Sequence, residues 1–184
     1  STSLKITVPR TLSISVDNKY GDVEIADLTG DLSIENSSGE ISIDGGGGQL
    51  DIRNSYSMVS VSDFAGPVEI RNTSGAVEAR DIKGATTITN SYKRVRFRNI
   101  GGPLEITSSS GDISGRGVKG RCDITTSYKT VDVADVAGDL HISAPSTSIK
   151  SVRTSGDLQI ETSYKDVVID SVSGRLTLSG QSAR

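Results

Sequence analysis

Branched aliphatic residues recur along this chain in closely spaced pairs, and the pairs repeat at an unbroken eighteen-residue period. Nine consecutive units fit this period without a gap, and they begin at residues 18, 36, 54, 72, 90, 108, 126, 144 and 162. The sixth residue of every unit is Val or Ile, the seventeenth is Ile or Leu, and glycine stands thirteenth, from Gly30 to Gly174. A fixed period of this length predicts a repeat architecture.

Each unit predicts two short strands joined by tight corners. Apolar residues at positions six and eight, and again at fifteen and seventeen, turn one face of each strand toward a common interior. The eleventh residue and the glycine at thirteen lie between them as a corner. Successive units stacked in register would form ladders of like side chains. The pattern therefore predicts an all-β fold, a single-stranded parallel β-helix or β-solenoid of about nine coils.

The repeat also predicts the domain organisation, with the whole chain, residues 1–184, forming one β-solenoid domain. Residues 1–17 are predicted as capping strands around Pro9, residues 18–179 as the nine coils, and residues 180–184 as a short tail. Ile14 and Val16 fall where later units place their fifteenth and seventeenth residues. Because the tail is too short to cover the last coil, we expect end-to-end association into a homo-oligomer or a covering element from another chain.

A left-handed hexapeptide β-helix has a coil of the same length and is the competing fold. It would place aliphatic side chains at every sixth position, for example at positions five, eleven and seventeen. The fifth position instead holds residues such as Asp22, Glu40 and Arg94, which a core would not accept. This alternative therefore ranks second.

Two segments depart from the repeat. In the eighth unit, Ser151 and Thr154 occupy positions that are apolar in most units, and Val152 is apolar one place late. A slip of one residue reverses the faces of a strand, so we expect a bulge or a re-routed corner there. Gly45 to Gly48 likewise predict a loosened corner in the second unit.

Composition and charge narrow the classes of partner. The net charge is −3 with both signs interspersed, which gives no electrostatic case for nucleic acid or an anionic membrane as partner. No apolar run approaches the roughly 20 residues that span a bilayer, so direct membrane insertion of this segment is not expected. The single cysteine, Cys122, stands in the apolar fifteenth column and is interpreted as a buried thiol of low reactivity.

Tyrosine recurs at twice the basic period, which pairs the coils, and serine occupies the same place in the intervening units. A tyrosine ring is taller than one coil, so each ring could cover its small neighbours, and this corner packing is one interpretation. The other is a row of rings and cations that contacts a glycan, a peptide or another subunit. The candidate interaction surface consists of Tyr56, Tyr92, Lys93, Tyr128, Lys129, Tyr164 and Lys165.

Three polar columns are candidate sites. Asparagine at the first position of five units is typical of a corner ladder. Aspartate or asparagine at the tenth position of five units could bind calcium but is also an ordinary turn former. Carboxylates and His141 share the outward-facing sixteenth column, yet no inserted loop is present to build a cleft around them. We expect no metal, no cofactor and no catalytic residues.

The repeated motif N-S-Y/S-G-x-V-x-(I/V)-x-x-(I/V)-x-G-x-L-x-I, present from Asn18 to Ser179, resembles the bacterial toast-rack domain, an adhesin-type domain of unknown function. The resemblance covers nearly the whole chain. It implies a single-domain β-solenoid, favours a right-handed coil, and implies a place outside the cytoplasm, in the periplasm, at the cell surface or secreted. The family brings no set of catalytic residues to carry over.

The function expected from the sequence is a non-enzymatic adhesive or structural interaction module at the bacterial cell envelope, with a glycan or an envelope protein as partner. Two alternatives stay open. One is a carbohydrate-active enzyme of the β-helix type, which needs a clustered acid and base in a cleft. The other is a ligand-sensing domain of an envelope regulatory protein, which needs a partner segment beyond the repeats.

Overall fold

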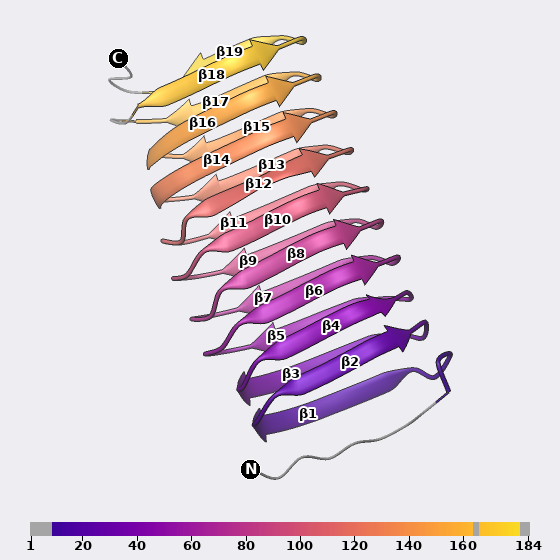
Figure 1. Cartoon of the computed structure of the whole chain (residues 1–184). Helices are drawn as coiled ribbons and strands as arrows, with labels where there is room; N and C mark the ends of the chain where they lie inside the picture. Colours follow the sequence, from indigo (N-terminus) through magenta and orange to yellow (C-terminus); the bar gives the residue numbers. More distant parts are fainter. Residues whose placement is uncertain (1–8, 164–165, 181–184) are drawn as a thin grey trace.

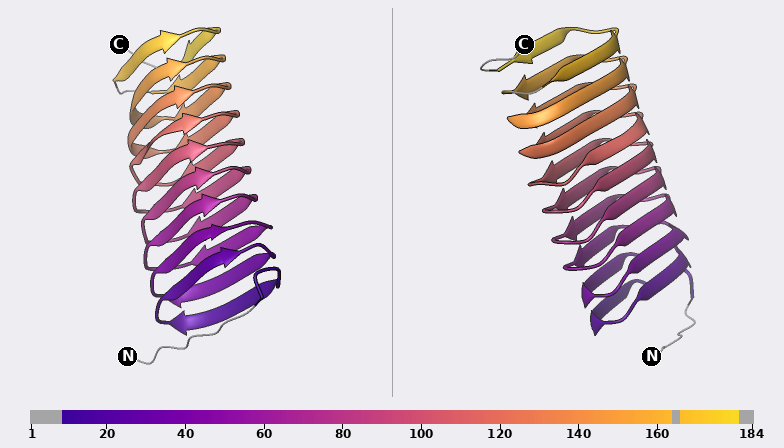
Figure 2. Two further views of the ribbon diagram at one scale, coloured as in Figure 1. Left: turned by 45° about the vertical axis from the view of Figure 1, so that its right-hand side comes forward. Right: turned by 60° about the vertical axis from the view of Figure 1, so that its left-hand side comes forward.

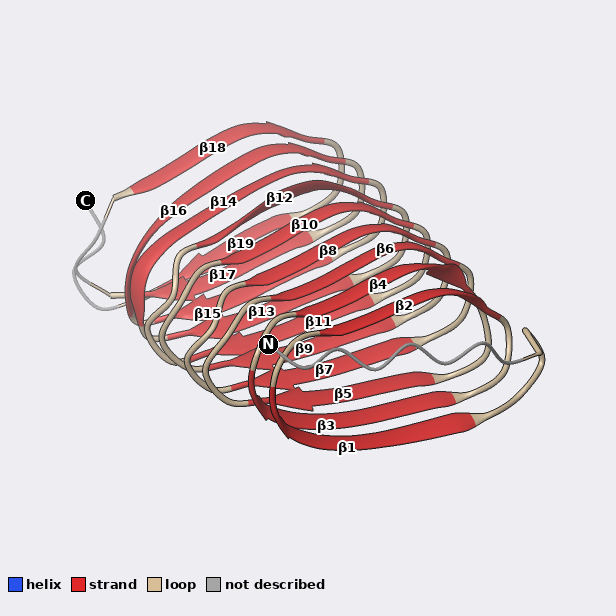
Figure 3. Ribbon diagram, turned by 60° about the horizontal axis from the view of Figure 1, so that its bottom comes forward, coloured by secondary structure: helices blue, strands red, loops and turns tan. Residues whose placement is uncertain are grey.

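The computed structural model describes residues 9–163 and 166–180, and this part of the chain forms a stack of short strands that climbs steadily from the N-terminal to the C-terminal end (Figure 1). All elements in the described residues are strands, and they alternate between two parallel sheets that face each other along the whole stack (Figure 3). The predicted all-β parallel solenoid is confirmed.

The first sheet has ten strands, formed by the fifteenth and seventeenth columns. Its strands, in spatial order, are β1 (Ile14–Tyr20), β3 (Leu32–Ser38), β5 (Leu50–Asn54), β7 (Val68–Asn72), β9 (Thr86–Asn90), β11 (Leu104–Ser108), β13 (Cys122–Thr126), β15 (Leu140–Ala144), β17 (Leu158–Thr162) and β19 (Leu176–Ser179).

The second sheet has nine strands and carries the sixth and eighth columns. Its strands are β2 (Val23–Leu28), β4 (Ile41–Gly46), β6 (Val59–Phe64), β8 (Val77–Ile82), β10 (Val95–Ile100), β12 (Ile113–Val118), β14 (Tyr128–Val136), β16 (Ser146–Thr154) and β18 (Val167–Val172).

Every strand pairs with its equivalent in the next coil, so the sequence period is also the register of both sheets. Leu104 lies opposite Cys122 and Ile106 opposite Ile124, and the same offset holds on the facing sheet, where Val95 lies opposite Ile113. The aliphatic columns thus form buried ladders between the sheets. Burial is shared between neighbours, which explains why the pattern needs so few apolar residues in each coil.

The coil is right-handed. Seen from its N-terminal end, the chain follows the even-numbered strands from left to right and returns along the odd-numbered strands as it recedes (Figure 3), and the strand directions in Figure 1 agree. The two-sheet cross-section also excludes the hexapeptide alternative, because aliphatic residues at every sixth position would give each coil a third side. The handedness favoured by the family resemblance is confirmed.

The glycine at the thirteenth position marks a close approach between the backbones of successive coils. A Cβ atom built on Gly84 would lie 2.3 Å from the carbonyl oxygen of Gly66, and one built on Gly66 would lie 1.7 Å from that of Gly48. Real Cβ atoms do not approach a carbonyl oxygen so closely. Glycine therefore occupies this corner in every unit because the backbones of successive coils stack there without room for a side chain.

The N-terminal prediction is confirmed where the structure describes it. Ile14 and Val16 on β1 lie opposite Leu32 and Ile34, so this segment is a half-coil added to the first sheet. The other predicted capping strand falls largely on residues 1–8, outside the described residues. At the opposite end Leu176 and Leu178 on β19 are 50% and 46% exposed. Association through the ends stays a prediction.

The predicted bulge in the eighth unit is wrong. Strand β16 keeps its register with both neighbours, so that Ser151 lies opposite Val133 and Ile169, and Val152 stays on the outer face. Ser151 and Thr154 are both buried, and their hydroxyl oxygens lie 3.3 Å apart in a hydrogen bond. Two polar side chains that satisfy each other can replace two apolar ones, so the strand has no need to slip.

Because Ser151 and Thr154 are hydrogen-bonded to each other, we expect the stability effects of replacing them to be non-additive in a double-mutant cycle. Ser151→Ala or Thr154→Val alone should lower the free energy of unfolding by about 1–3 kcal/mol, because each leaves a buried hydroxyl without its partner. The double variant should lower the free energy of unfolding by less than the two single variants together, since it removes both buried polar groups. Denaturant unfolding of the four proteins measures the coupling. Additive costs would show that the two hydroxyls do not depend on each other.

The predicted loosening at Gly45 to Gly48 is also wrong. The backbone keeps the inter-coil hydrogen bonds of the other corners, with Gly47 N donating to Leu28 O at 2.9 Å and Ala65 N donating to Gly46 O at 2.9 Å. A Cβ atom on Gly46 would meet the backbone of Leu28 in the preceding coil, and it would lie 3.1 Å from the ring of Phe64 in the next coil. The missing side chain thus makes room for the large ring in the next coil, which is an exchange of volume along one ladder.

Candidate interaction surface

The corners that lead from the first sheet to the second carry the tyrosines. Tyr20 ends β1, Tyr56 and Tyr92 lie in the corners before β6 and β10, and Tyr128 opens β14. These four residues, which we call the tyrosine edge, succeed one another at every second coil. The corners on this side of the coils follow one another along one side of the stack (Figure 2). At about 4.8 Å per coil, neighbouring tyrosines are roughly 10 Å apart.

The rings of the tyrosine edge stand largely in solvent. Tyr20, Tyr56, Tyr92 and Tyr128 are 81%, 68%, 63% and 58% exposed. More than half of the surface of each described tyrosine is therefore in contact with solvent and not with the small neighbouring residues. The corner-packing interpretation is wrong for this larger part. Exposed aromatic side chains at a regular spacing are unusual on a soluble surface, where they are enriched at contact sites.

Cations accompany two of the described rings. Lys93 and Lys129 follow Tyr92 and Tyr128 and are exposed, and Lys129 adopts a φ of 81°. The remaining predicted pair, Tyr164 and Lys165, lies outside the described residues. The described edge thus presents two ring-and-lysine pairs and two further rings.

The asparagine column holds the tyrosine corners in place. Asn54 is buried, and its Nδ2 donates to Ser57 O at 3.0 Å in its own coil and to Gly39 O at 3.2 Å in the preceding coil. Asn72 Nδ2 likewise donates to Ser57 O at 2.9 Å. Asn54 and Asn72 thus each tie two successive corners together, whereas Asn90 Nδ2 donates within its own corner, to Lys93 O at 2.7 Å. The predicted structural ladder is confirmed as a set of amide-to-backbone hydrogen bonds. The tyrosines therefore project from a fixed backbone.

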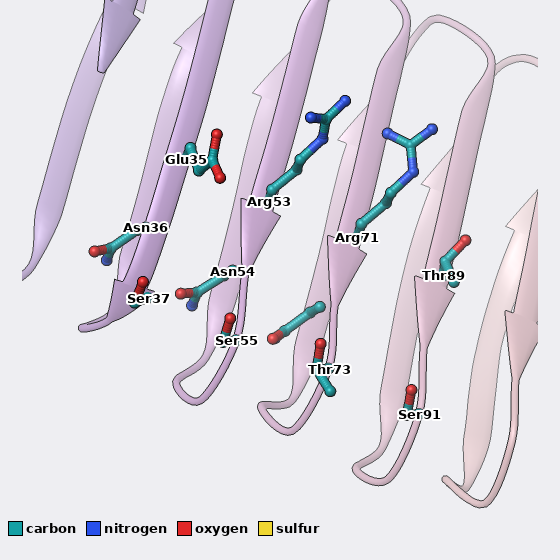
Figure 4. A pocket seen from close by; sticks show the side chains of 11 residues that line it. Glu35, Asn36, Ser37, Arg53, Asn54, Ser55, Arg71, Thr73, Thr89 and Ser91 are labelled. Carbon is teal, nitrogen blue, oxygen red and sulfur yellow. The ribbon is translucent and has the colours of Figure 1, made fainter. Parts of the chain in front are cut away.

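A hollow of about 240 Å³ lies beside these corners on the outer side of β3, β5, β7 and β9 (Figure 4). Arg53 and Arg71 stand over it, and each lies 3.8 Å from Asp51, while Arg71 also pairs with Glu69. The charges of this hollow are balanced by carboxylates of the same sheet. It therefore offers hydroxyl and amide groups beside the tyrosine edge rather than a net charge.

The sixteenth column does bring His141 close to carboxylates. Its Nδ1 lies 3.6 Å from Asp123 and its Nε2 lies 3.9 Å from Glu161. Asp123, however, already accepts two hydrogen bonds of 2.7 Å from Arg121, which raises the pKa of that guanidinium. This arrangement is a surface ion-pair network in which the carboxylate is occupied by a cation.

The tenth column has a backbone explanation. Asp27, Asp63, Asp81, Asn99 and Asp135 all adopt positive φ angles between 54° and 58°, the left-handed region that Asp and Asn tolerate better than other side chains. Their interpretation as turn formers is confirmed. In the described ranges, 9–163 and 166–180, no three His, Cys, Asp or Glu side chains gather closely enough to share a metal ion.

Side chains along this column also pair between coils. Asn99 Nδ2 donates to Asp81 at 2.7 Å, and Arg153 Nε donates to Asp135 at 2.5 Å. The hydrogen bond from Arg153 lowers the pKa of the Asp135 carboxyl, with a smaller contribution from the charge of Arg116. The carboxylates of this column thus form hydrogen bonds that link the corners of successive coils.

Cys122 is fully buried in the fifteenth column, opposite Leu104 and Leu140. Burial raises the pKa of its thiol to about 12. Because the thiolate is the nucleophilic form, the folded chain holds this group in its unreactive form at neutral pH. The predicted buried thiol is confirmed.

One charged column was missed in the sequence. The ninth residues of the fourth, fifth and sixth units are Arg80, Arg98 and Arg116, and the structure places them side by side on the outer face of the second sheet. Their regular spacing was visible in the sequence, but the column is interrupted by Ala, Asp, Ser and Val in the other units. Only the register shows that the three cations form one group.

These features define a class: a right-handed parallel β-solenoid of minimal coils with an exposed tyrosine edge, in which buried asparagines hydrogen-bond the corners of Tyr56 and Tyr92. The chain belongs to the family described as Toastrack DUF4097, whose model matches residues 1–166. Searches of curated proteins and of solved structures found no match. The family resemblance drawn from the repeat motif is confirmed. The part of the chain that the structure describes contains no helical segment that could span a bilayer.

Proposed function

We propose that this chain is a non-enzymatic interaction module that acts outside the cytoplasm and binds a glycan or an envelope protein through its tyrosine edge. The observation that carries the proposal is the exposure of four rings at regular intervals along one side of a rigid stack. Aromatic faces stack on sugar rings and on peptide side chains, and adjacent lysines add hydrogen-bond donors and cation–π contacts.

The scaffold supports binding in preference to catalysis. Short corners join the strands throughout the described residues, and the carboxylate nearest His141 is engaged by Arg121. A flat, repetitive edge suits a repetitive partner, because several weak contacts in a row add up to useful affinity. The place outside the cytoplasm is what the family resemblance implies, and protease treatment of intact cells that express the full-length protein would test it.

The binding test compares variants on one array of bacterial and host glycans and envelope peptides. Tyr92→Ala/Tyr128→Ala should weaken the binding of a ligand to the tyrosine edge about fivefold or more, because each lost aromatic contact is worth about 0.5–1.5 kcal/mol. The thermal unfolding midpoint should hardly change, since the rings are exposed.

Ser74→Ala/Ser110→Ala is the matched control. These serines occupy the same column in the intervening coils, so the control removes two side chains from the same corner row without removing a ring. Retained binding in the control, together with loss in the tyrosine variant, is the expected result. Equal binding by both variants, or the absence of any ligand on the array, would contradict the proposal.

A further inference from the structure

A second charged feature lies on the other side of the fold. Arg98 on β10 lies directly opposite Arg80 on β8 and Arg116 on β12, in the parallel register of the second sheet (Figure 1). All three side chains are exposed on the outer face. Successive guanidinium groups are therefore attached about 4.8 Å apart. We call these three residues the arginine ladder.

The arginine ladder differs from the other arginines that stack in register. Arg53 and Arg71 on the first sheet are each paired with a carboxylate of Asp51 or Glu69. Within the residues that the structure describes, no carboxylate lies within ion-pair distance of Arg80, Arg98 or Arg116, although the charge of Arg116 acts on Asp135 over a longer distance. Like charges directly opposite each other on neighbouring strands are destabilising, so the ladder carries a repulsion that an external anion would relieve.

The surroundings of the ladder limit the shape of that anion. Ser62 and Ala134 occupy the same column in the coils on either side, so the ladder is three residues long. The neighbouring outward column carries Glu78, which pairs with Arg96 at 3.7 Å, and Asp132. The basic stripe is thus narrow, with carboxylates beside it.

A hollow of about 500 Å³ follows this stripe across β8, β10, β12 and β14. The three ladder arginines line it together with Phe97 and Gly115. A Cβ atom on Gly115 would lie 2.5 Å from the ring of Phe97, so the ring of one coil fills the place of the missing side chain in the next. The small residues Ser114 and Ala134 also line the hollow.

We propose that the arginine ladder binds a linear anionic polysaccharide with one carboxylate on each sugar. Guanidinium groups match carboxylates with two parallel hydrogen bonds. An extended hexuronate chain that lies along the row carries its carboxylates at intervals on the scale of the strand spacing, so more than one of them can meet the arginines. The ligand would lie along the axis of the stack.

Three other polyanionic partners fit the stripe less well. A bilayer or a nucleic-acid duplex is wide, and it would bring its charges against Glu78 and Asp132 as well as against the ladder. Single-stranded nucleic acid is recognised by stacking on aromatic side chains. The exposed aromatic residues of the described chain lie on the tyrosine edge, away from this column.

The test is calorimetric titration of the whole chain at low ionic strength with an oligomer of galacturonic acid, and with the neutral galactose oligomer of the same length. We expect binding of the acidic oligomer alone, weakened by added salt. Arg98→Gln should reduce the affinity about five- to tenfold, since it removes one charge-assisted contact from the centre of the row.

Arg53→Gln is the matched control, because it changes the net charge equally but removes an arginine that is already paired with Asp51. Its affinity should equal that of the unmodified chain. Arg98→Lys should weaken binding by less than Arg98→Gln, because lysine keeps the charge but loses the planar fork. Equal losses in Arg98→Gln and Arg53→Gln would overturn the site, as would no binding of the acidic oligomer.

Two further titrations test the class of ligand. Inorganic polyphosphate and vesicles of phosphatidylglycerol should bind more weakly than the acidic oligomer, and tighter binding of either would overturn the assignment to a polysaccharide. The Tyr92→Ala/Tyr128→Ala variant should bind the acidic oligomer normally. The proposed binding sites at the arginine ladder and at the tyrosine edge can therefore be confirmed or contradicted independently.

Discussion

Replacing Ile106 by alanine is expected to lower the free energy of unfolding by about 3 kcal/mol or more. Ile106 is fully buried on β11, and its ladder continues through Ile88 in one neighbouring coil and Ile124 in the other. The coils above and below fix the strand spacing, so the surrounding backbone cannot close around the lost side chain. Denaturant unfolding followed by circular dichroism measures the change.

Leu178→Ala is the control for this substitution. Leu178 occupies the same seventeenth column on β19, pairs only with Ile160 among the described strands, and is 46% exposed. Its replacement should cost about 1 kcal/mol, because less apolar surface is lost and no enclosed cavity forms. Equal costs at the two positions would show that the ladder does not share its burial between coils.

Gly66→Ala is expected to cost about 3 kcal/mol, although it adds only one methyl group. The added Cβ atom would meet the backbone carbonyl oxygen of Gly48 at 1.7 Å, and a backbone cannot turn aside as a side chain can. The two coils must separate at the corner, which disturbs packing and hydrogen bonds on both sides. The thermal unfolding midpoint and the free energy of unfolding should both fall.

Gly47→Ala is the control that distinguishes the effect of this clash from the effect of replacing any glycine in a corner. The nearest atom to a Cβ on Gly47 is the Cβ of Ala65 at 3.9 Å, an ordinary contact, and no left-handed φ is required there. The variant should change stability by no more than about 0.5–1 kcal/mol, with stabilisation the expected direction. A large loss in Gly47→Ala, or none in Gly66→Ala, would contradict the role assigned to the glycine series.

The polar columns show which structural roles residue type alone can predict. Asp27 and its equivalents were correctly interpreted as turn formers, because Asp and Asn are the ordinary occupants of a left-handed backbone position. The asparagine ladder was also foreseen, since a short amide at a corner has the adjacent carbonyl groups within reach. Both depend on local backbone chemistry: the left-handed position recurs at the same corner in every coil, and the asparagine in five of them.

Predictions that depended on the fit of side chains were less successful. A polar residue in an apolar column suggested a slipped strand at Ser151, because the sequence does not show that Thr154 would supply its hydrogen-bond partner. A run of glycines suggested a loose corner, because the sequence does not show that the ring of Phe64 would occupy the space over Gly46. In each case the compensation comes from a different position or a neighbouring coil.

The sequence by itself determined the period, the two strands of each coil, the columns that are buried and the family, because a strict repeat of apolar pairs has one efficient way to stack. Only the tertiary structure decided how far the tyrosine rings stand out from their corners and which arginines lack a carboxylate partner. Exposure and charge balance depend on the distances between side chains of adjacent coils, and these distances exist only after the register has formed.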